Sequence, residues 1–319
     1  MQLKKFFSAV ALILFLLVPK FSEAAEFEMV EYSALVKLQW LKAAGIPEAD
    51  KFFKTIGKNP FFSERNLKDF DRIEKLNSVF QELNYAAAIE YVKANDYKSV
   101  MDIACSFSPR PMILAKDNRK VNVCELQAVV VTADELMKKL ADKKTQQNVG
   151  YEVVLVEDRD AMFETARKTG SGKVCIIEQG LMVYLPRERE TRMFEIIRDV
   201  LTERGGCCIT SDFVMKDYFK KVAAGLYGEK DSQLLYDETK AMYEKVLDDK
   251  LFDETYKSEN DAISYLKNLG LKVEKVPLLA DASKLNCLKN LTPEQRENIS
   301  KVAAENYLWV LTPIKNSTK

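Results

Sequence analysis

The residues best suited to chemistry begin with a run of small and polar side chains after a short apolar segment. Residues 99–103 (Ser-Val-Met-Asp-Ile) form that segment, and residues 104–110 (Ala-Cys-Ser-Phe-Ser-Pro-Arg) follow it. We interpret the run as a buried strand, a turn and the start of a helix. In nucleotide-binding α/β folds the backbone of such a turn contacts the ligand and a helix N-terminus faces it. Glycine is usual there because it has no Cβ, but none lies between Asp102 and Arg110.

Carboxylates stand at the ends of the next two expected strands. Glu125 ends the second, and Asp158 and Asp160 follow the third. A carboxylate at the end of the second strand can accept hydrogen bonds from both hydroxyls of a ribose, and an acidic loop after the third can accept one from an exocyclic amine such as that of adenine. Each position has a structural alternative. Glu125 could be a solvated strand end, and Asp158 or Asp160 an N-cap of the helix that begins near Ala161.

A fourth candidate site follows the expected strand over residues 173–178. Glu178, Gln179 and Gly180 stand at its end, and Tyr184 lies four residues beyond the glycine. The structural alternative is a strand, a glycine turn and a core aromatic side chain. The chain contains no histidine, which excludes a Ser-His-Asp triad, a Cys-His dyad and most catalytic zinc sites.

Together these runs resemble the leucine carboxyl methyltransferase and polyketide-type O-methyltransferase family. The strand-four motif of that family, Glu-Gly-Leu-Leu-Met-Tyr-Leu, is similar to residues 179–185 (Gln-Gly-Leu-Met-Val-Tyr-Leu). Its Ala-Ala-Gly-Phe-Ser-Pro-Arg motif is similar to residues 104–110. Glu125-Leu126 stands where the family has Asp-Leu, and the resemblance extends over about residues 32–279.

Two positions depart from the family pattern. Ser106 replaces the turn glycine, which adds a side chain where the backbone approaches the ligand. Gln179 replaces the family's glutamate. Glu178 precedes it, but neighbouring residues of a strand point to opposite faces, so Glu178 is not a simple substitute.

The resemblance implies a class I methyltransferase that uses S-adenosylmethionine as cosubstrate and no metal. The implied acceptor is an oxygen, carboxylate or hydroxyl, of a small molecule or a peptide. The residues matched to the cosubstrate site are Arg72, Ala104, Ser106, Arg110, Glu125, Asp158 and Gln179. Methyl transfer suits a histidine-free protein because a sulfonium is already a strong electrophile, so that alignment and desolvation supply much of the catalysis.

The acceptor decides whether a general base is needed. A carboxylate needs none, whereas a phenol or alcohol would need one, and the nearby candidates are Tyr184, Glu178 and Asp212. Two alternatives to the enzyme remain open. One is an exported methyltransferase-like protein that has lost catalysis and binds a ligand or partner. The other is an exported protein that uses another adenosine-like or small anionic ligand.

The elements that must position these residues form an α/β fold. Short apolar segments alternate with longer amphipathic ones from residue 97 on, which is typical of βαβ units. We expect a Rossmann-like, seven-stranded, mostly parallel sheet with helices on both faces and an N-terminal helical cap. The expected strands are 98–104, 121–126, 151–156, 173–178, 206–211, 271–278 and 307–312, and the main helices are 127–143, 187–204, 258–269 and 292–306. The cap covers residues 25–95, and the methyltransferase-like domain covers 96–319 with a helical insertion near 216–250.

Residues 1–24 have the layout of a secretory signal. Lys4 and Lys5 precede an apolar run over residues 6–18, and small residues stand at −1 and −3 of a cleavage after Ala24. We expect export, secreted or periplasmic. The alternatives are an uncleaved anchor, the one case in which membrane contact is expected, and a cytoplasmic protein with a misread leader.

The charge balance and the positions of the cysteines argue against some partners and against some metal and redox sites. The 48 basic residues equal the 48 acidic ones, so nucleic acid is not expected as a partner. Five of the six cysteines lie in or beside apolar strand-like runs and no CxxC pair occurs, so we expect free thiols and neither a zinc ribbon nor a thioredoxin-type site.

Overall fold

A computed structural model describes residues 30–57, 70–247 and 256–315. The expected leader over residues 1–24 lies outside the described residues. None of the helices in the described ranges is both long and apolar enough to cross a membrane.

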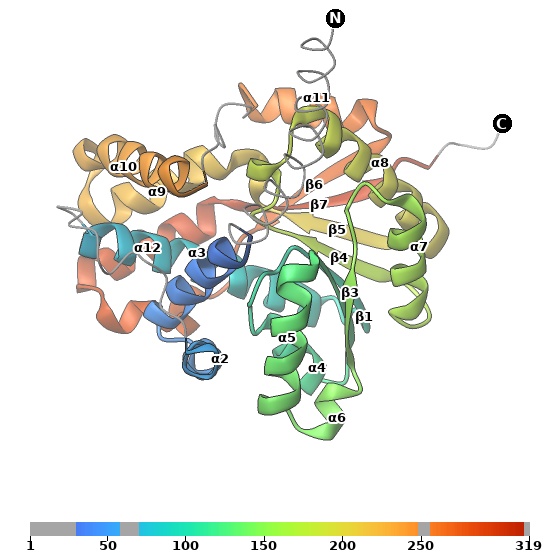
Figure 1. The fold of residues 1–319 in the computed structure, drawn as a ribbon. Helices are drawn as coiled ribbons and strands as arrows, with labels where there is room; N and C mark the ends of the chain where they lie inside the picture. Colours follow the sequence, from blue (N-terminus) through green and yellow to red (C-terminus); the bar gives the residue numbers. More distant parts are fainter. Residues whose placement is uncertain (1–29, 58–69, 248–255, 316–319) are drawn as a thin grey trace, which may run out of the picture.

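The strands form one seven-stranded sheet in the order β3-β2-β1-β4-β5-β7-β6. The first five strands are parallel, and β7 is antiparallel to both β5 and β6. The bounds are β1 Ser99–Ile103, β2 Lys120–Glu125, β3 Val149–Val153, β4 Val174–Glu178, β5 Gly206–Thr210, β6 Leu271–Pro277 and β7 Tyr307–Pro313. The expected Rossmann-like, mostly parallel sheet is confirmed (Figure 1).

The β3 strand differs from its expected bounds of 151–156. It begins at Val149, opposite Val121, and ends at Val153, opposite Glu125, where β2 also ends. Beyond Glu125 no partner strand continues on that side, so the apolar residues after Val153 turn away toward α7.

Helices cover both faces of the sheet because the central strands bury side chains on both sides. Along β1, Val100 belongs to one core and Met101 to the other, as the alternation of a strand requires. The helices of the first core are α2 Pro47–Ile56, α3 Phe70–Ala94, α4 Arg110–Lys116, α5 Gln127–Leu140, α9 Met215–Tyr227, α10 Glu229–Leu247 and α12 Pro293–Glu305. Those of the second core are α7 Arg159–Lys168, α8 Arg187–Arg204 and α11 Glu259–Asn268.

Several helices pack together beside the sheet and form part of the wall of the candidate site. A helix over residues 30–43 precedes α2, and α3 packs against α9 and α10. Figure 1 shows α3, α9, α10 and α12 gathered at one end of the molecule, away from α7 and α8. The helices α9 and α10 occupy most of residues 216–250, where a helical insertion is expected. Short elements complete the chain: α6 Lys143–Gln146, η2 Met182–Tyr184, η3 Asp212–Val214, η4 Ala282–Lys284 and η5 Cys287–Asn290.

All six cysteines are buried, free thiols. Cys175 on β4 and Cys207 on β5 are register partners in the sheet and lie in the same core. This arrangement agrees with the expectation that cysteine serves here as a small buried hydrophobic residue.

Candidate functional site

The turn after β1 has a glycine-like backbone without glycine. Ala104 has φ 52° and Ser106 has φ 61°, both in the left-handed region that side chains with a Cβ rarely adopt. The Ser106 N–H donates a hydrogen bond of 2.6 Å to Oε1 of Glu125, and the Leu126 N–H donates one of 3.1 Å to Oε2. Glu125 therefore holds the turn in this conformation.

Glu125 is 6% exposed, so its interpretation as a solvated strand end is wrong. Burial raises its pKa, while the two backbone N–H groups and the charge of Lys37 oppose the shift. Each carboxylate oxygen has two acceptor sites and uses one for the turn. One acceptor site on each oxygen is left for a ligand such as a pair of ribose hydroxyls.

Arg110 begins α4 and is 2% exposed. Its Nε and Nη2 atoms donate to the two oxygens of Asp102 at 2.8 and 2.5 Å, and its Nη1 donates to Oε1 of Gln179 at 2.7 Å. A guanidinium has donors only, so it selects the oxygen of the Gln179 amide and turns Nε2 the other way. Gln179 is 4% exposed, and its Nε2 has no hydrogen-bond partner among the described residues.

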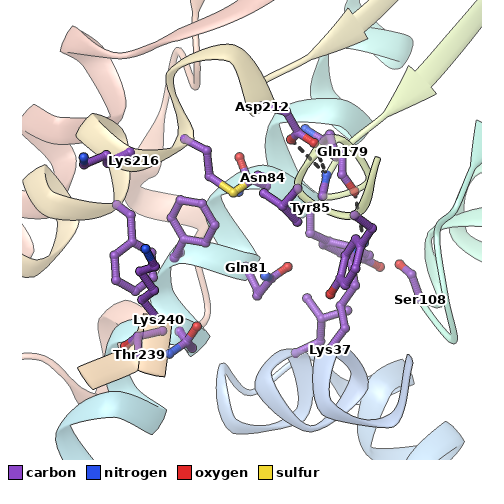
Figure 2. A pocket seen from close by; sticks show the side chains of 18 of the residues that line it. Lys37, Gln81, Asn84, Tyr85, Ser108, Gln179, Asp212, Lys216, Thr239 and Lys240 are labelled. Carbon is purple, nitrogen blue, oxygen red and sulfur yellow. Dashed lines mark hydrogen bonds between the residues drawn. The ribbon is translucent and has the colours of Figure 1, made fainter. Parts of the chain in front are cut away.

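A cavity opens beside Gln179, at the carboxyl ends of β4 and β5 (Figure 2). It encloses about 900 Å³ of empty space, including the part open to solvent. Its walls come from the helix over residues 30–43, from α3, from the loops after β1, β4 and β5, and from α9 and α10. A crevice at the carboxyl ends of parallel strands is where open α/β folds bind ligands.

Two carboxyl groups shape the loop after β4. Asp212 accepts hydrogen bonds from the N–H groups of Gly180, Leu181 and Met182 at 2.7, 3.1 and 3.3 Å. Glu178 accepts one from Thr210 Oγ1 at 2.7 Å and one from Leu181 N at 3.4 Å. Burial and the proximity of the two carboxyls raise the pKa of Glu178, and burial raises that of Asp212.

The candidate general bases are therefore placed differently. Tyr184 and Asp212 line the cavity. Glu178 is fully buried beneath the loop and is not among the lining residues. Its side chain contacts Thr210 while that of Gln179 contacts Arg110, as expected for neighbours on opposite faces of a strand.

Two expected ligand residues have other contacts. Asp158 is the exposed N-cap of α7 and accepts from Ala161 N at 3.1 Å, which confirms its structural alternative. Arg72 does not line the cavity; its guanidinium pairs with Asp231 on α10 and stacks over Tyr227. Arg72 does not reach the cavity because the cavity contacts a different face of α3.

That face of α3 carries Asn77, Gln81 and Asn84, which all line the cavity. Their spacing of four and three residues puts them on one side of the helix. Their helical spacing within an otherwise apolar pattern is visible in the sequence, although none of the three is among the expected site residues. Lys37 was also missed. Its Nζ donates to the backbone oxygen of Gln179 at 3.3 Å, and burial together with the charge of Arg110 lowers its pKa.

Within the described ranges no group of three or more Cys, Asp or Glu residues is arranged to hold a metal ion. No protein-family model matches the chain. No curated protein matches it either.

The chain is similar in fold to several solved structures. A DUF574 family protein from Streptomyces avermitilis MA-4680 aligns with a TM-score of 0.49 and 10% identity, over 86% of this chain and 95% of that one. The methyltransferase domain of bacterial CtHen1 aligns with a TM-score of 0.44 and 13% identity, over 74% and 99%. The magnesium protoporphyrin IX methyltransferase from Synechocystis PCC 6803, solved with bound SAM, aligns with a TM-score of 0.42 and 12% identity, over 81% and 94%.

Proposed function

We propose that this chain is an S-adenosylmethionine-dependent methyltransferase whose acceptor is an oxygen of a small molecule or of a peptide carboxylate. The observation that carries the proposal is the left-handed turn at Ala104 and Ser106, held by the buried carboxylate Glu125 at the end of the neighbouring strand. The resemblance of the motifs around Ser106 and Gln179 to the O-methyltransferase family supports the same function.

The cosubstrate fits two features of the chain. Glu125 keeps an acceptor site on each oxygen, which matches the two hydroxyls of a ribose. The left-handed turn brings backbone against the ligand side of the sheet, although Ser106 adds a Cβ there. When bound, S-adenosylmethionine would supply an electrophilic methyl group, and its sulfur would keep the electron pair of the broken C–S bond.

The chain contributes alignment and, for a hydroxyl acceptor, a proton acceptor. Arg110 orients Gln179, and Lys37 holds the backbone at the same residue, so both fix the cavity wall next to the sheet. Asp212 and Tyr184 line the cavity and are the groups that could take a proton from an acceptor hydroxyl. The raised pKa of Asp212 makes it a stronger base than an ordinary aspartate.

A second candidate function is a ligand-binding protein without catalysis. One observation favours it: among the described residues, Ser108, Arg110 and Gln179 line the cavity, whereas Ser106 and Glu125 do not. Such a protein would bind a ligand at Gln179 and would not depend on Glu125.

Calorimetric titration of the full chain with S-adenosylmethionine tests the proposal. We expect measurable binding that Glu125→Gln weakens by about tenfold or more, because the amide turns a donor toward a backbone N–H. The matched control is Glu135→Gln on the exposed face of α5, which should bind like the wild type. Absence of heat at millimolar cosubstrate would contradict the proposal. Binding that Glu125→Gln leaves unchanged would favour the second function.

Localisation is a separate proposal. The leader pattern over residues 1–24 supports export, with cleavage after Ala24. Mass spectrometry of the mature N-terminus tests it, and an intact Met1 in the soluble cytosolic fraction would contradict it.

A further inference from the structure

Gln179, directly after β4, presents a hydrogen-bond donor in the wall of the cavity. Nη1 of Arg110 donates to its Oε1 at 2.7 Å, and the Nε and Nη2 atoms of Arg110 are held by Asp102. A guanidinium has donors only, so the amide oxygen must face Arg110 and the amide nitrogen must face the other way. A glutamate at this position, as in the resembled family, would present only acceptors when ionised.

The Gln179 donor is not satisfied by the protein. The residue is 4% exposed, and Nε2 has no hydrogen-bond partner among the described residues. A buried polar atom without a partner costs about 1–3 kcal/mol, so such atoms are rare in folded proteins unless a ligand or water binds them. Because Gln179 lines the cavity, a ligand there that accepts a hydrogen bond would remove this cost.

Asn84 on α3 is a second amide whose oxygen is already used. It is 8% exposed and lines the cavity, and its Oδ1 accepts a hydrogen bond of 2.8 Å from Oγ of Ser211. Its Nδ2 therefore remains as a donor for a ligand. Figure 2 shows Asn84 and Gln179 in the upper part of the view, and Thr239 and Lys240 in the lower part.

Lys37 adds a positive charge beside Gln179. Among the described residues, its Nζ donates one hydrogen bond, of 3.3 Å, to the backbone oxygen of Gln179, which leaves two of its three N–H groups for a ligand. Burial and the charge of Arg110 lower the pKa of Lys37, while the charges of Asp102 and Glu125 oppose that shift. An anionic ligand beside Lys37 would stabilise its charged form, so this end of the cavity favours an acid over a neutral or cationic ligand.

Asp212 is the only carboxyl group among the described residues that line the cavity. It follows Ser211 in the chain, and its oxygens accept hydrogen bonds from the backbone N–H groups of Gly180, Leu181 and Met182. Its acceptor sites are therefore largely used by the loop after β4. At the sheet end of the cavity, donors outnumber the acceptors that are left for a ligand.

The rest of the lining can hold an apolar body. Leu41, Phe80, Val183, Met215 and Phe219 line the cavity, and the rings of Phe80 and Phe219 meet edge to face with their centroids 5.1 Å apart. Apolar and aromatic walls with a few polar groups that fix orientation are typical of small-molecule sites. A carboxylate attached to an apolar or aromatic body fits this arrangement.

We propose that the end of the cavity beside the sheet binds the carboxylate of an organic acid, with Gln179 Nε2, Asn84 Nδ2 and Lys37 Nζ as its hydrogen-bond donors. The apolar walls contact the body of the acid. Gln179 is then a specificity-determining residue, because the orientation that Arg110 imposes on its amide selects an oxygen and rejects an ammonium group. The assignment of this acid as the methyl acceptor rests on the proposed function; the carboxylate site itself does not.

Three ligands with the same aromatic body and different polar ends test the site without any reaction. They are para-fluorophenylacetate, its neutral amide and para-fluorophenethylamine, each titrated with the full chain by fluorine NMR. We expect the acid to bind about tenfold more tightly than the amide, and the amine to bind most weakly, because charge-assisted hydrogen bonds are about twice as strong as neutral ones. An amide or an amine that binds as tightly as the acid would overturn the proposal.

Gln179→Glu and Asn84→Asp each replace an amide donor by a carboxylate of the same shape. The new carboxylate of Gln179→Glu can still accept from Arg110, so the contact with the wall is kept while the donor is lost. We expect each variant to weaken binding of the acid by about tenfold or more, and Gln179→Glu to bind the amine more tightly than the acid.

The matched control is Asn260→Asp, which adds the same charge at an exposed position near the start of α11 and should bind the acid like the wild type. Thermal unfolding shows which variants are folded. A preference for the acid that survives in a folded Gln179→Glu or Asn84→Asp variant would overturn the proposal.

Repeating the acid titration with saturating S-adenosylmethionine identifies the source of the carboxylate, since the cosubstrate also carries one. Acid binding that persists supports the acid as methyl acceptor. Displacement of the acid would assign the site to the cosubstrate's own carboxylate and overturn the acceptor assignment. A wild type that prefers the acid but does not bind the cosubstrate would contradict the proposed function and leave the carboxylate site standing. A wild type that binds the cosubstrate without preferring the acid would overturn the carboxylate site alone.

Discussion

Asp102 and Arg110 form a two-point ion pair in the interior of the protein. The carboxylate is on β1 and is 0% exposed; the guanidinium begins α4 and reaches it with Nε and Nη2. The third donor direction of Arg110 is used for Gln179. The ion pair and the hydrogen bond to Gln179 therefore connect the turn after β1 to the loop after β4. They stabilise the part of the cavity wall that these two segments form.

Removing the charge of Asp102 should be among the most destabilising single changes in the chain. Asp102→Asn leaves a buried guanidinium without a counter-charge, which costs about 3–5 kcal/mol. Urea unfolding measures the loss. The control is Asp134→Asn, which breaks the exposed pair with Lys138 on α5 and should cost less than about 1 kcal/mol. Similar losses in both variants would contradict the role given to the buried pair.

Replacing Ser106 by glycine should relieve the turn. A side chain held at φ 61° is strained, so Ser106→Gly is expected to raise the free energy of unfolding by about 0.5–1 kcal/mol and to strengthen cosubstrate binding. Asn118→Gly is the matched control, because Asn118 has φ 58° but asparagine tolerates this region. A Ser106→Gly variant less stable than the wild type would show that the serine side chain supports the turn.

The buried carboxyl of Glu178 should make stability depend on pH. Burial raises its folded-state pKa above the unfolded value, so its contribution is complete at acid pH and is lost as the pH rises toward the folded pKa. The neutral variant Glu178→Gln avoids this loss. Its stability relative to the wild type should increase with pH, by at most about 1.4 kcal/mol per pH unit.

Urea unfolding of both proteins from about pH 5 to about pH 8 measures this difference. Glu164→Gln, at the exposed pair with Lys168, provides the baseline. A difference between wild type and Glu178→Gln that stays constant over this range would contradict a raised folded-state pKa of Glu178.

The six thiols should be unreactive in the folded protein. All are buried, which keeps the reagent out, and burial raises the pKa of Cys105, Cys175 and Cys208. A hydrogen bond with Cys175 lowers the pKa of Cys207, so the protection of Cys207 depends on its burial alone. Ellman's reagent should label none of them quickly under native conditions and all six in guanidinium without reductant. Fewer than six in the unfolded chain would reveal a disulfide.

Most of the fold could be predicted from the sequence because the apolar runs, and the prolines and glycines at their ends, indicate the same helices and strands. The helix α8 has the expected bounds of 187–204, since Pro186 precedes it and Gly205 follows it. The edge strand β3 was displaced, because its position depends on pairing with β2 rather than on its own apolar residues. The local sequence pattern determines whether a segment forms a helix or a strand. Pairing with the neighbouring strand determines where an edge strand begins and ends.

Residues of the candidate site could be predicted only where they belong to a sequence motif. Gln179, predicted from its place at the end of a strand, lines the cavity, whereas Arg72 on α3 pairs with Asp231 and does not line it. Which face of a long helix meets the sheet is decided by packing, and Asn77, Gln81 and Asn84 lie on that face. Lys37 had no local signal at all, because a lysine on an amphipathic helix is ordinary until another segment folds against it.

The hydrogen bond from Lys37 to the backbone of Gln179 joins residues 142 positions apart, and α10 follows later still. No partly folded chain can therefore offer the complete cavity. A ligand that fills it would bind only the finished fold and would act as a reporter of complete folding. At a hundred times its dissociation constant, it would raise the free energy of unfolding by about 2.7 kcal/mol, which makes thermal shift a direct screen for the acceptor.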